Sequence, residues 1–78
     1  MGLREIVGRN LRRLRRSRRL SQEELADQAG INRNYVGMLE REENAATVDM
    51  LEKIADVLNV DPIEFFKRPS REASHTRR

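Results

Sequence analysis

The sequence predicts an all-α fold, and three observations lead to this fold class. Apolar residues recur at intervals of three and four along most of the chain, which is the spacing that gives a helix one apolar face. Capping residues precede these segments, and glycine or asparagine follows two of them. The alternation of apolar and polar residues that marks a half-buried strand is absent. We therefore expect five short helices and no sheet.

The first helix is expected over residues 3–18. Its apolar stripe consists of leucine, isoleucine and valine at helical spacing, namely Leu3, Ile6, Val7, Leu11 and Leu14. Arginines occupy most of the remaining circumference, and we expect them to face solvent or a phosphate backbone. Arg15 is an exception, because it follows Leu14 directly and is expected to point partly inward.

Two helices joined by a tight turn form the centre of the chain. Ser21 and Glu24 make the S-x-x-E capping box that begins the first of them. Gly30 ends that helix, because glycine adopts the left-handed conformation without steric cost. Asn32 can cap the next helix, which is expected over residues 32–41. Two short helices around a glycine turn are typical of a helix-turn-helix.

The second of these helices has two contrasting faces. Its apolar positions, expected to face the core, are Tyr35, Val36 and Leu39. The opposite face carries polar or small side chains that suit a DNA groove: Arg33, Asn34, Gly37, Met38 and Arg41. Our working hypothesis is that this face reads DNA.

Two further helices follow. Thr47 caps a helix that Asn59 ends. Asp61 caps a last short helix over residues 61–66, with Pro62 at the first helical position, where proline is well tolerated.

The chain is expected to form one domain, residues 1–66, followed by a tail, residues 67–78. The tail holds no large apolar residue and five of its residues are basic, which indicates a disordered basic segment. A chain of 78 residues buries only about 60–65% of its unfolded surface. Tight helix packing and oligomerisation are the remaining sources of stability.

Several kinds of site are excluded by composition. The chain has no cysteine and one histidine, His75, in the predicted tail, so we expect no disulfide, no metal site and no cofactor. No serine, histidine and aspartate can form a catalytic arrangement, and we expect no enzyme activity. No apolar run approaches the roughly 18 residues of a membrane helix, and no signal-peptide core is present. These features fit a cytoplasmic protein.

Charge is segregated along the chain, although the formal net charge is only +3. Residues 1–19 hold eight arginines and one acid, which give +7, and residues 67–78 hold five bases and one acid, which give +4. Residues 20–66 hold three bases and eleven acids, which give −8. Fourteen of the sixteen bases are arginine, a side chain suited to bidentate contacts with phosphate and guanine. The basic ends indicate a polyanionic partner, with a solvated basic helix face as the alternative.

These residues together resemble a known family. The segment LSQEELADQAGINRNYVGMLER, followed by VDMLEKIADVLNV and then DPIEFF, is similar to the Cro/repressor-type helix-turn-helix family, also called the XRE family. Its short length resembles that of small phage repressors and of controller proteins of restriction–modification systems. The resemblance implies a lambda-repressor-like domain of five helices. It also implies a homodimeric transcriptional regulator that inserts residues 32–41 into the major groove of a pseudo-palindromic double-stranded DNA operator.

The resemblance also implies roles for individual residues. It places Arg33, Asn34 and Met38 at base edges, and Gly37, on the same face, is a fourth base-reading candidate. A phosphate contact is the alternative for Arg33 and Asn34, and a core position between helices is the alternative for Met38. The phosphate-binding candidates are Gln22, Tyr35, Arg41, Asn44 and Arg16. In several members an ion pair at the positions of Arg15 and Glu40 ties the first helix to the third, so we expect a structural pair here.

Two positions depart from the family pattern. Where a glycine and a basic loop often follow the third helix, this chain has Glu42 and Glu43, two acids near an expected phosphate. Gly37 replaces a serine or larger residue, and glycine inside a helix costs about 1 kcal/mol relative to alanine.

Apolar residues of the last two helices are candidates for a dimer interface, namely Met50, Ile63 and Phe66. The alternative is that the phenylalanines only close the core. A protein-interaction adaptor with a helix-turn-helix fold and little DNA affinity is the alternative function, because the central segment is acidic.

Overall fold

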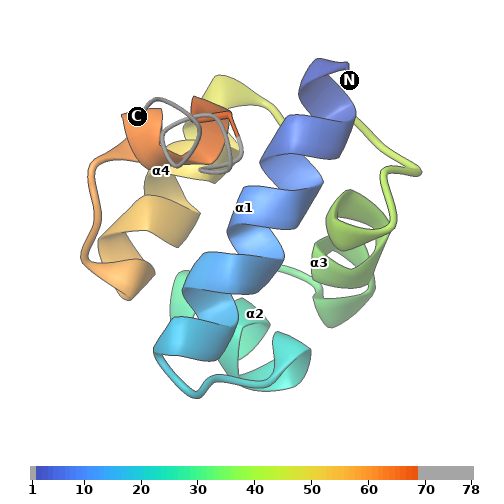
Figure 1. Cartoon of the computed structure of the whole chain (residues 1–78). Helices are drawn as coiled ribbons and strands as arrows, with labels where there is room; N and C mark the ends of the chain where they lie inside the picture. Colours follow the sequence, from blue (N-terminus) through green and yellow to red (C-terminus); the bar gives the residue numbers. More distant parts are fainter. Residues whose placement is uncertain (1, 69–78) are drawn as a thin grey trace.

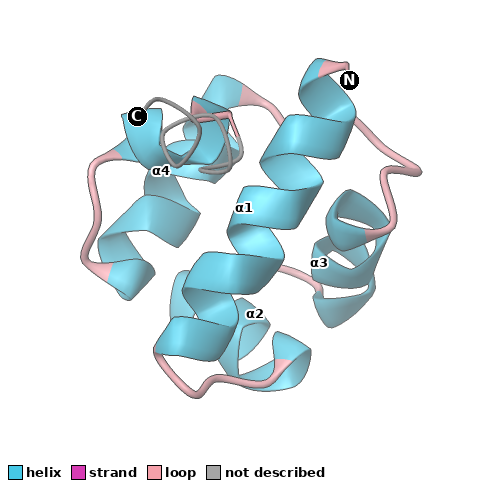
Figure 2. Cartoon of the chain, viewed as in Figure 1, coloured by secondary structure: helices cyan, strands magenta, loops and turns pink. Residues whose placement is uncertain are grey.

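A computed structural model describes residues 2–68 of the chain, and every regular element in this range is helical (Figures 1 and 2). The elements are α1 Leu3–Ser17, α2 Gln22–Ala29, α3 Arg33–Glu40, α4 Val48–Leu58 and the 3₁₀ helix η1 Pro62–Phe66. In Figure 1, α1 crosses in front of the other helices, with α3 to one side and α4 with η1 to the other. The predicted all-α fold class is confirmed.

The helix boundaries lie at the predicted capping residues. Ser21 and Glu24 form a complete capping box, in which each side chain bonds the backbone N–H of the other residue. Gly30 and Asn59 end α2 and α4 in the left-handed conformation, with φ of 69° and 57°. Thr47 caps α4 by accepting a hydrogen bond from the N–H of Met50 at 3.1 Å.

Two boundaries and one helix type differ from the sequence prediction. The first helix ends at Ser17, and Arg41 is the C-cap of α3 rather than its last residue. Residues 62–66 form a 3₁₀ helix, so the described chain has four α-helices instead of five. The segment has five residues, which is short for a repeated i to i−4 pattern, and short helical pieces of this kind often take the 3₁₀ form. The predicted tail lies largely outside the described residues, and so does His75.

The core is formed by the apolar stripes of all five elements. Its side chains with no exposed surface are Leu11, Leu25, Val36, Ile54, Ala55, Leu58 and Phe65. Phe65 anchors η1 against the helices, whereas the neighbouring Phe66 is 40% exposed. Only one of the two phenylalanines therefore closes the core.

Two residues of α1 outside its predicted apolar stripe, Gly8 and Asn10, are also buried. A Cβ atom on Gly8 would lie 2.7 Å from the carbonyl oxygen of Leu39, so glycine is what allows α1 and α3 to cross so closely here. The Asn10 amide donates to the carbonyl oxygens of Phe65 and Lys67 at 2.9 and 2.7 Å. Asn10 thereby fixes the end of η1 to α1.

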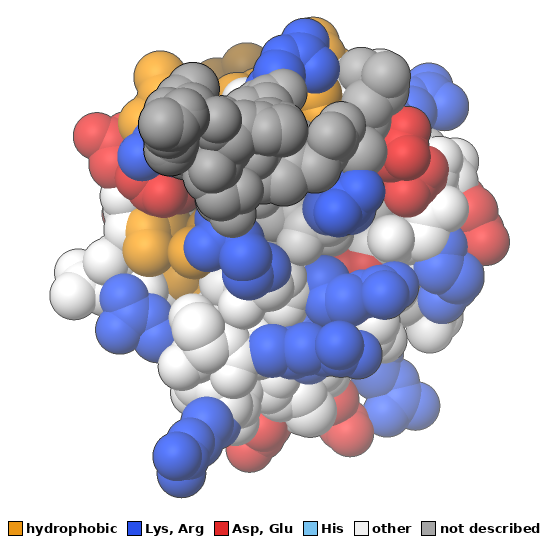
Figure 3. Space-filling view, in the orientation of Figure 1, with side chains coloured by type: hydrophobic (Ala, Val, Ile, Leu, Met, Phe, Trp, Pro, Cys, Tyr) orange, Lys and Arg blue, Asp and Glu red, His pale blue; other side chains and the backbone are white. Residues whose placement is uncertain are grey.

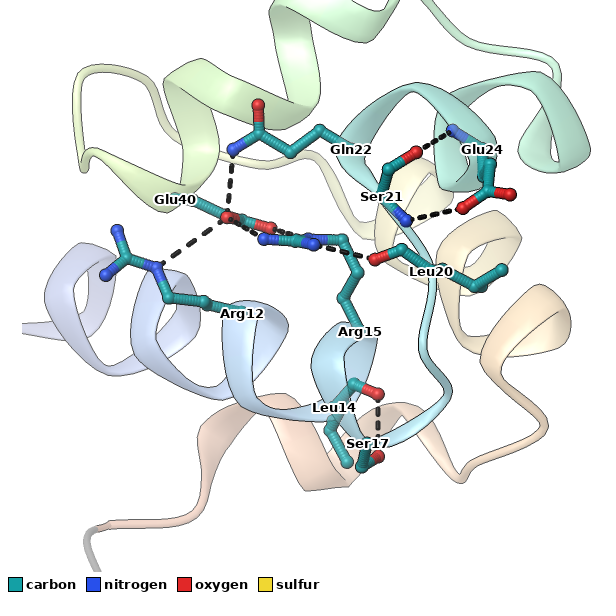
Figure 4. Close-up of polar contacts among 9 residues, drawn as sticks. All are labelled: Arg12, Leu14, Arg15, Ser17, Leu20, Ser21, Gln22, Glu24 and Glu40. Carbon is teal, nitrogen blue, oxygen red and sulfur yellow. Dashed lines mark hydrogen bonds and ion pairs between the residues drawn. The ribbon is translucent and has the colours of Figure 1, made fainter.

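Arg15 and Glu40 form a buried ion pair between α1 and α3 (Figure 4). Nε of Arg15 donates to Oε2 of Glu40 at 2.6 Å, and Nη2 donates to Oε1 at 3.0 Å. The third guanidinium nitrogen, Nη1, donates to the carbonyl oxygen of Leu20 at 2.7 Å. Gln22 at the start of α2 donates to the same carboxylate at 3.0 Å. One network therefore joins α1, the α1–α2 connection, α2 and α3.

The surroundings of this carboxylate set its protonation state. Burial alone would raise the pKa of Glu40, but the hydrogen bonds from Arg15 and Gln22 and the charges of Arg15 and Arg12 outweigh burial and lower the pKa. The hydrogen bond from Glu40 correspondingly raises the pKa of Arg15. Both groups are therefore charged at neutral pH, and each compensates the buried charge of the other.

α3 ends in a left-handed residue that is not glycine. Glu42 has φ of 65°, and its N–H bonds the carbonyl oxygen of Leu39 at 3.1 Å, while the N–H of Glu43 bonds that of Met38 at 2.8 Å. These two bonds are the Schellman motif, in which glycine is the usual left-handed residue. Glu42 stands where the resembling family often has glycine.

Replacing Glu40 by alanine is expected to lower the free energy of unfolding by about 3 kcal/mol or more, because the Arg15 guanidinium would stay buried without its partner. Replacing Arg15 by methionine and Glu40 by leucine together should cost much less, since no charge would remain buried. Urea unfolding followed by circular dichroism measures the free energy of unfolding of Glu40→Ala, of Arg15→Met and Glu40→Leu alone, and of the double variant. Additive costs would contradict the pairing.

The same carboxylate should make stability depend on pH. Its pKa in the folded state is below the ordinary value of 4.5. The stabilisation is therefore fully present above that value and is lost as the pH falls through the lower folded pKa. Urea unfolding between about pH 5 and pH 3 should show a shallower pH dependence for Glu40→Gln than for the wild type. Identical slopes would show that Glu40 does not change its pKa on folding.

Glycine at position 42 is expected to stabilise the protein by about 1 kcal/mol, because a non-glycine residue in the left-handed conformation is strained. Thermal unfolding measures the change. Glu42→Gln separates charge from conformation and should be close to neutral. Glu52→Gly, at an exposed position inside α4, should instead destabilise by about 1 kcal/mol.

Candidate nucleic-acid interface

A shallow groove lies between the start of α2 and the exposed face of α3. Its lining residues from these elements and the α3 cap are Ser21, Gln22, Glu23, Arg33, Asn34, Gly37 and Arg41. The helix-turn-helix geometry brings them together, because the α2 N-terminus and α3 meet at the buried Arg15–Glu40 pair. Arg33 and Asn34 follow directly after the Asn32 cap, where α3 begins. Five of the nine predicted DNA-contacting residues thus share one surface.

Gly37 makes room for two polar side chains in this groove. A Cβ atom there would lie 3.0 Å from Nη1 of Arg41 and 3.3 Å from Oε1 of Gln22. Those distances are tighter than ordinary van der Waals contact, so an alanine would require the ends of these two side chains to move by a few tenths of an ångström. Glycine at this position therefore allows both side chains to lie close to α3.

Arg33 of α3 and Arg41, the C-cap of that helix, each form an ion pair with an acid. Nη1 of Arg33 lies 3.0 Å from Oε2 of Glu23, the second residue of α2. Nε of Arg41 donates to Oε2 of Glu43 at 2.9 Å, and Nη2 donates to Oε1 at 3.3 Å. The bond from Arg41 lowers the pKa of Glu43, and Glu43 in turn raises the pKa of Arg41. The sequence pattern gave no sign of either pair.

The other predicted α3 and loop contacts lie outside this groove. The Tyr35 hydroxyl donates to the carbonyl oxygen of Ala45 at 3.3 Å, and the ring is half-buried against the core. Met38 is half-buried, and Asn44 is exposed in the α3–α4 connection. Tyr35 therefore links α3 to the connection that follows it.

A basic surface runs along α1 beside the end of α3. It is formed by four exposed arginines, Arg9, Arg12, Arg13 and Arg16. Glu40 and Glu42 line the same groove. Figure 3, in the orientation of Figure 1, shows basic side chains gathered over this helix. Arg12 reaches the Glu40 carboxylate at 3.7 Å. Glu42 thus lies among the arginines of α1.

Within residues 2–68, no group of three or more histidine, cysteine, aspartate and glutamate side chains could hold a metal ion. None of the helices in this range is both long and apolar enough to cross a membrane.

Known proteins are similar to this chain in sequence and in architecture. The helix-turn-helix family HTH_3 matches residues 11–65, which is more than half of the chain. Control protein C.SmaI of Serratia marcescens is 41% identical over 59 residues, which cover 76% of this chain and 70% of that protein.

Two solved structures have the same fold. The restriction–modification controller protein C.AhdI of Aeromonas hydrophila superposes with a TM-score of 0.78 at 38% identity, over 81% of this chain and 96% of that one. The hypothetical transcription factor NHTF of Neisseria superposes with a TM-score of 0.86 at 32% identity, over 96% and 86%.

Sequence, fold and the exposed face of α3 lead to the same conclusion. The chain belongs to the helix-turn-helix (XRE) family and is a DNA-binding transcriptional regulator.

Proposed function

We propose that the protein binds a pseudo-palindromic operator in double-stranded DNA with α3 in the major groove. The observation that carries this proposal is the groove that gathers Gln22, Arg33, Asn34 and Gly37 on one exposed surface. The buried Arg15–Glu40 pair holds α3 rigidly against α1, so the reading side chains start from a fixed helix.

Base recognition is assigned to the exposed face of α3. Arg33 can donate two hydrogen bonds to O6 and N7 of guanine, and Asn34 can pair with adenine. Gly37 lets side chains from Arg41 and Gln22 approach the helix backbone on this face, and Met38 can contact a thymine methyl group. Phosphate contacts are assigned to Gln22, Tyr35, Asn44 and Arg16. The other exposed arginines of α1 add to the non-specific attraction.

We further propose that the protein acts as a homodimer. Ile63 is 61% exposed and Phe66 is 40% exposed on η1, and large exposed apolar residues that lie together mark interfaces. Met50, the third residue proposed for the interface, is half-buried and packs against the core. A symmetric dimer that reads two half-sites in successive major grooves needs its two copies of α3 about 34 Å apart, one turn of DNA.

The cellular context is also a proposal. We place the protein in the cytoplasm, with residues 1–66 as the DNA-binding domain. The likeness to C.SmaI and C.AhdI, which are named as a control protein and a restriction–modification controller, supports a promoter of a restriction–modification system as the first to test.

Selection of bound sequences from a random duplex pool tests these proposals together. We expect enrichment of two inverted half-sites centred about 10 base pairs apart. A single half-site would contradict the dimer. Failure to retard random duplex at about 100 µM protein and low salt would favour the protein-interaction adaptor, because non-specific binding is usually tighter.

Arg33→Ala is expected to weaken operator binding by about 1–3 kcal/mol and to relax the preference at one base pair. Fluorescence anisotropy with the operator and its single-base variants measures both effects. Arg16→Ala serves as the comparison, since loss of a phosphate contact should weaken all sequences alike and reduce the salt slope by about 1. An equal loss on every sequence for Arg33→Ala would make it a phosphate contact.

Ile63→Glu is expected to shift sedimentation from dimer to monomer and to leave the helical circular dichroism unchanged, because the side chain is already 61% exposed. Leu3→Glu is the matched control, since Leu3 is 63% exposed but lies at the start of α1. Dissociation by both variants, or by neither, would exclude η1 as the specific interface.

A further inference from the structure

We propose that Glu43 is a positioning residue that holds Arg41 over Gly37 as a reader of guanine. This inference rests on the proposed insertion of α3 into the major groove, and it gives Arg41 a different role from the phosphate contact that the family resemblance implies. It also gives a function to an acid that the sequence pattern left unexplained.

The position of the guanidinium is the first observation. Arg41 is the C-cap of α3, with φ of −89° and ψ of 3°, so its side chain leaves the backbone toward the N-terminal end of the helix, as helical side chains do. Its Nη1 atom lies 3.0 Å from the Cβ position of Gly37, four residues earlier on the same face. The Arg41 side chain therefore folds back over the exposed face of α3 and lines the same groove as Arg33 and Asn34.

The second observation is which edge of the guanidinium Glu43 occupies. The carboxylate accepts from Nε at 2.9 Å and from Nη2 at 3.3 Å. A guanidinium has five N–H donors, so this bidentate contact uses two of them. The two terminal nitrogens, Nη1 and Nη2, keep the donors of their shared outer edge. Those parallel donors match the spacing of O6 and N7 on guanine.

The Arg33–Glu23 pair shows that this arrangement is not the general one. There the nitrogen nearest to the carboxylate is the terminal Nη1, at 3.0 Å, whereas the shortest contact of Arg41 with Glu43 is from Nε. A guanine that used Nη1 of Arg33 would compete with Glu23 for the donors of that nitrogen. Arg41 can keep Glu43 and read a base at the same time.

Stability and phosphate binding explain the Arg41–Glu43 pair less well. Both side chains are more than half exposed, at 54% and 53%, and ion pairs with that exposure contribute little to folding. A carboxylate beside a phosphate-binding arginine would repel the phosphate.

The test compares Glu43→Gln, Arg41→Ala and the double variant on the selected operator, on its single-base variants and on random duplex. Glu43→Gln should bind random duplex more tightly, because one negative charge near DNA is removed. It should also lose about tenfold in discrimination at one guanine position. Arg41→Ala should lose preference at that same position. The double variant should lose no more discrimination than Arg41→Ala alone.

Glu52→Gln is the matched control, because it removes an exposed carboxylate from α4 and should leave base discrimination unchanged. A uniform gain on all sequences for Glu43→Gln would overturn the positioning role and leave Glu43 as a simple repulsive charge. A uniform loss for Arg41→Ala would show that it contacts phosphate. A wild-type protein that enriches no sequence would overturn the operator-binding proposal itself, and this assignment with it.

Discussion

The buried pair of Arg15 and Glu40 is the interaction on which the arrangement of the reading surface depends. It is the point at which α1, the start of α2 and the end of α3 meet, through bonds of 2.6, 2.7 and 3.0 Å. A small core that lacks disulfides leaves helix positions sensitive to single contacts. A buried ion pair with all its partners supplies direction that apolar packing does not, because its hydrogen bonds are satisfied in one geometry.

The exposed face of α3, which this pair holds in place, has few basic side chains, and acids lie next to them. In the proposed complex, binding strength comes mainly from arginines along α1, whereas selectivity comes from a short row of side chains on α3. Acids next to the α3 arginines limit how firmly these side chains hold any phosphate. In such a complex, repulsion between the acids and the phosphates weakens binding to every DNA sequence. Base contacts recover this loss only on the operator, so the protein gains selectivity between sequences and loses affinity for all of them.

The fold was largely predictable, and the side-chain geometry of the site was not. Local signals such as the capping box at Ser21 and the left-handed Asn59 act within a few residues, so the sequence shows them directly. The Arg15–Glu40 pair was expected only from family resemblance. The position of the Asn10 amide on η1 depends on how distant elements pack, and no spacing rule encodes it. Arg41 lies over Gly37 at the i, i+4 spacing of one helix, but its bond to Glu43 depends on the turn that follows α3. The 3₁₀ form of η1 reflects its shortness.

α1 has a further consequence, because it touches both the reading helix and the proposed dimer surface. Gly8 fixes its crossing with α3, and two bonds from Asn10 fix the end of η1. In a dimer formed through η1, the packing of α1 would set the distance between the two-fold axis and each copy of α3. The distance between half-sites is therefore encoded in residues that touch neither DNA nor the partner. A change in this crossing would alter operator spacing while base preference stayed the same.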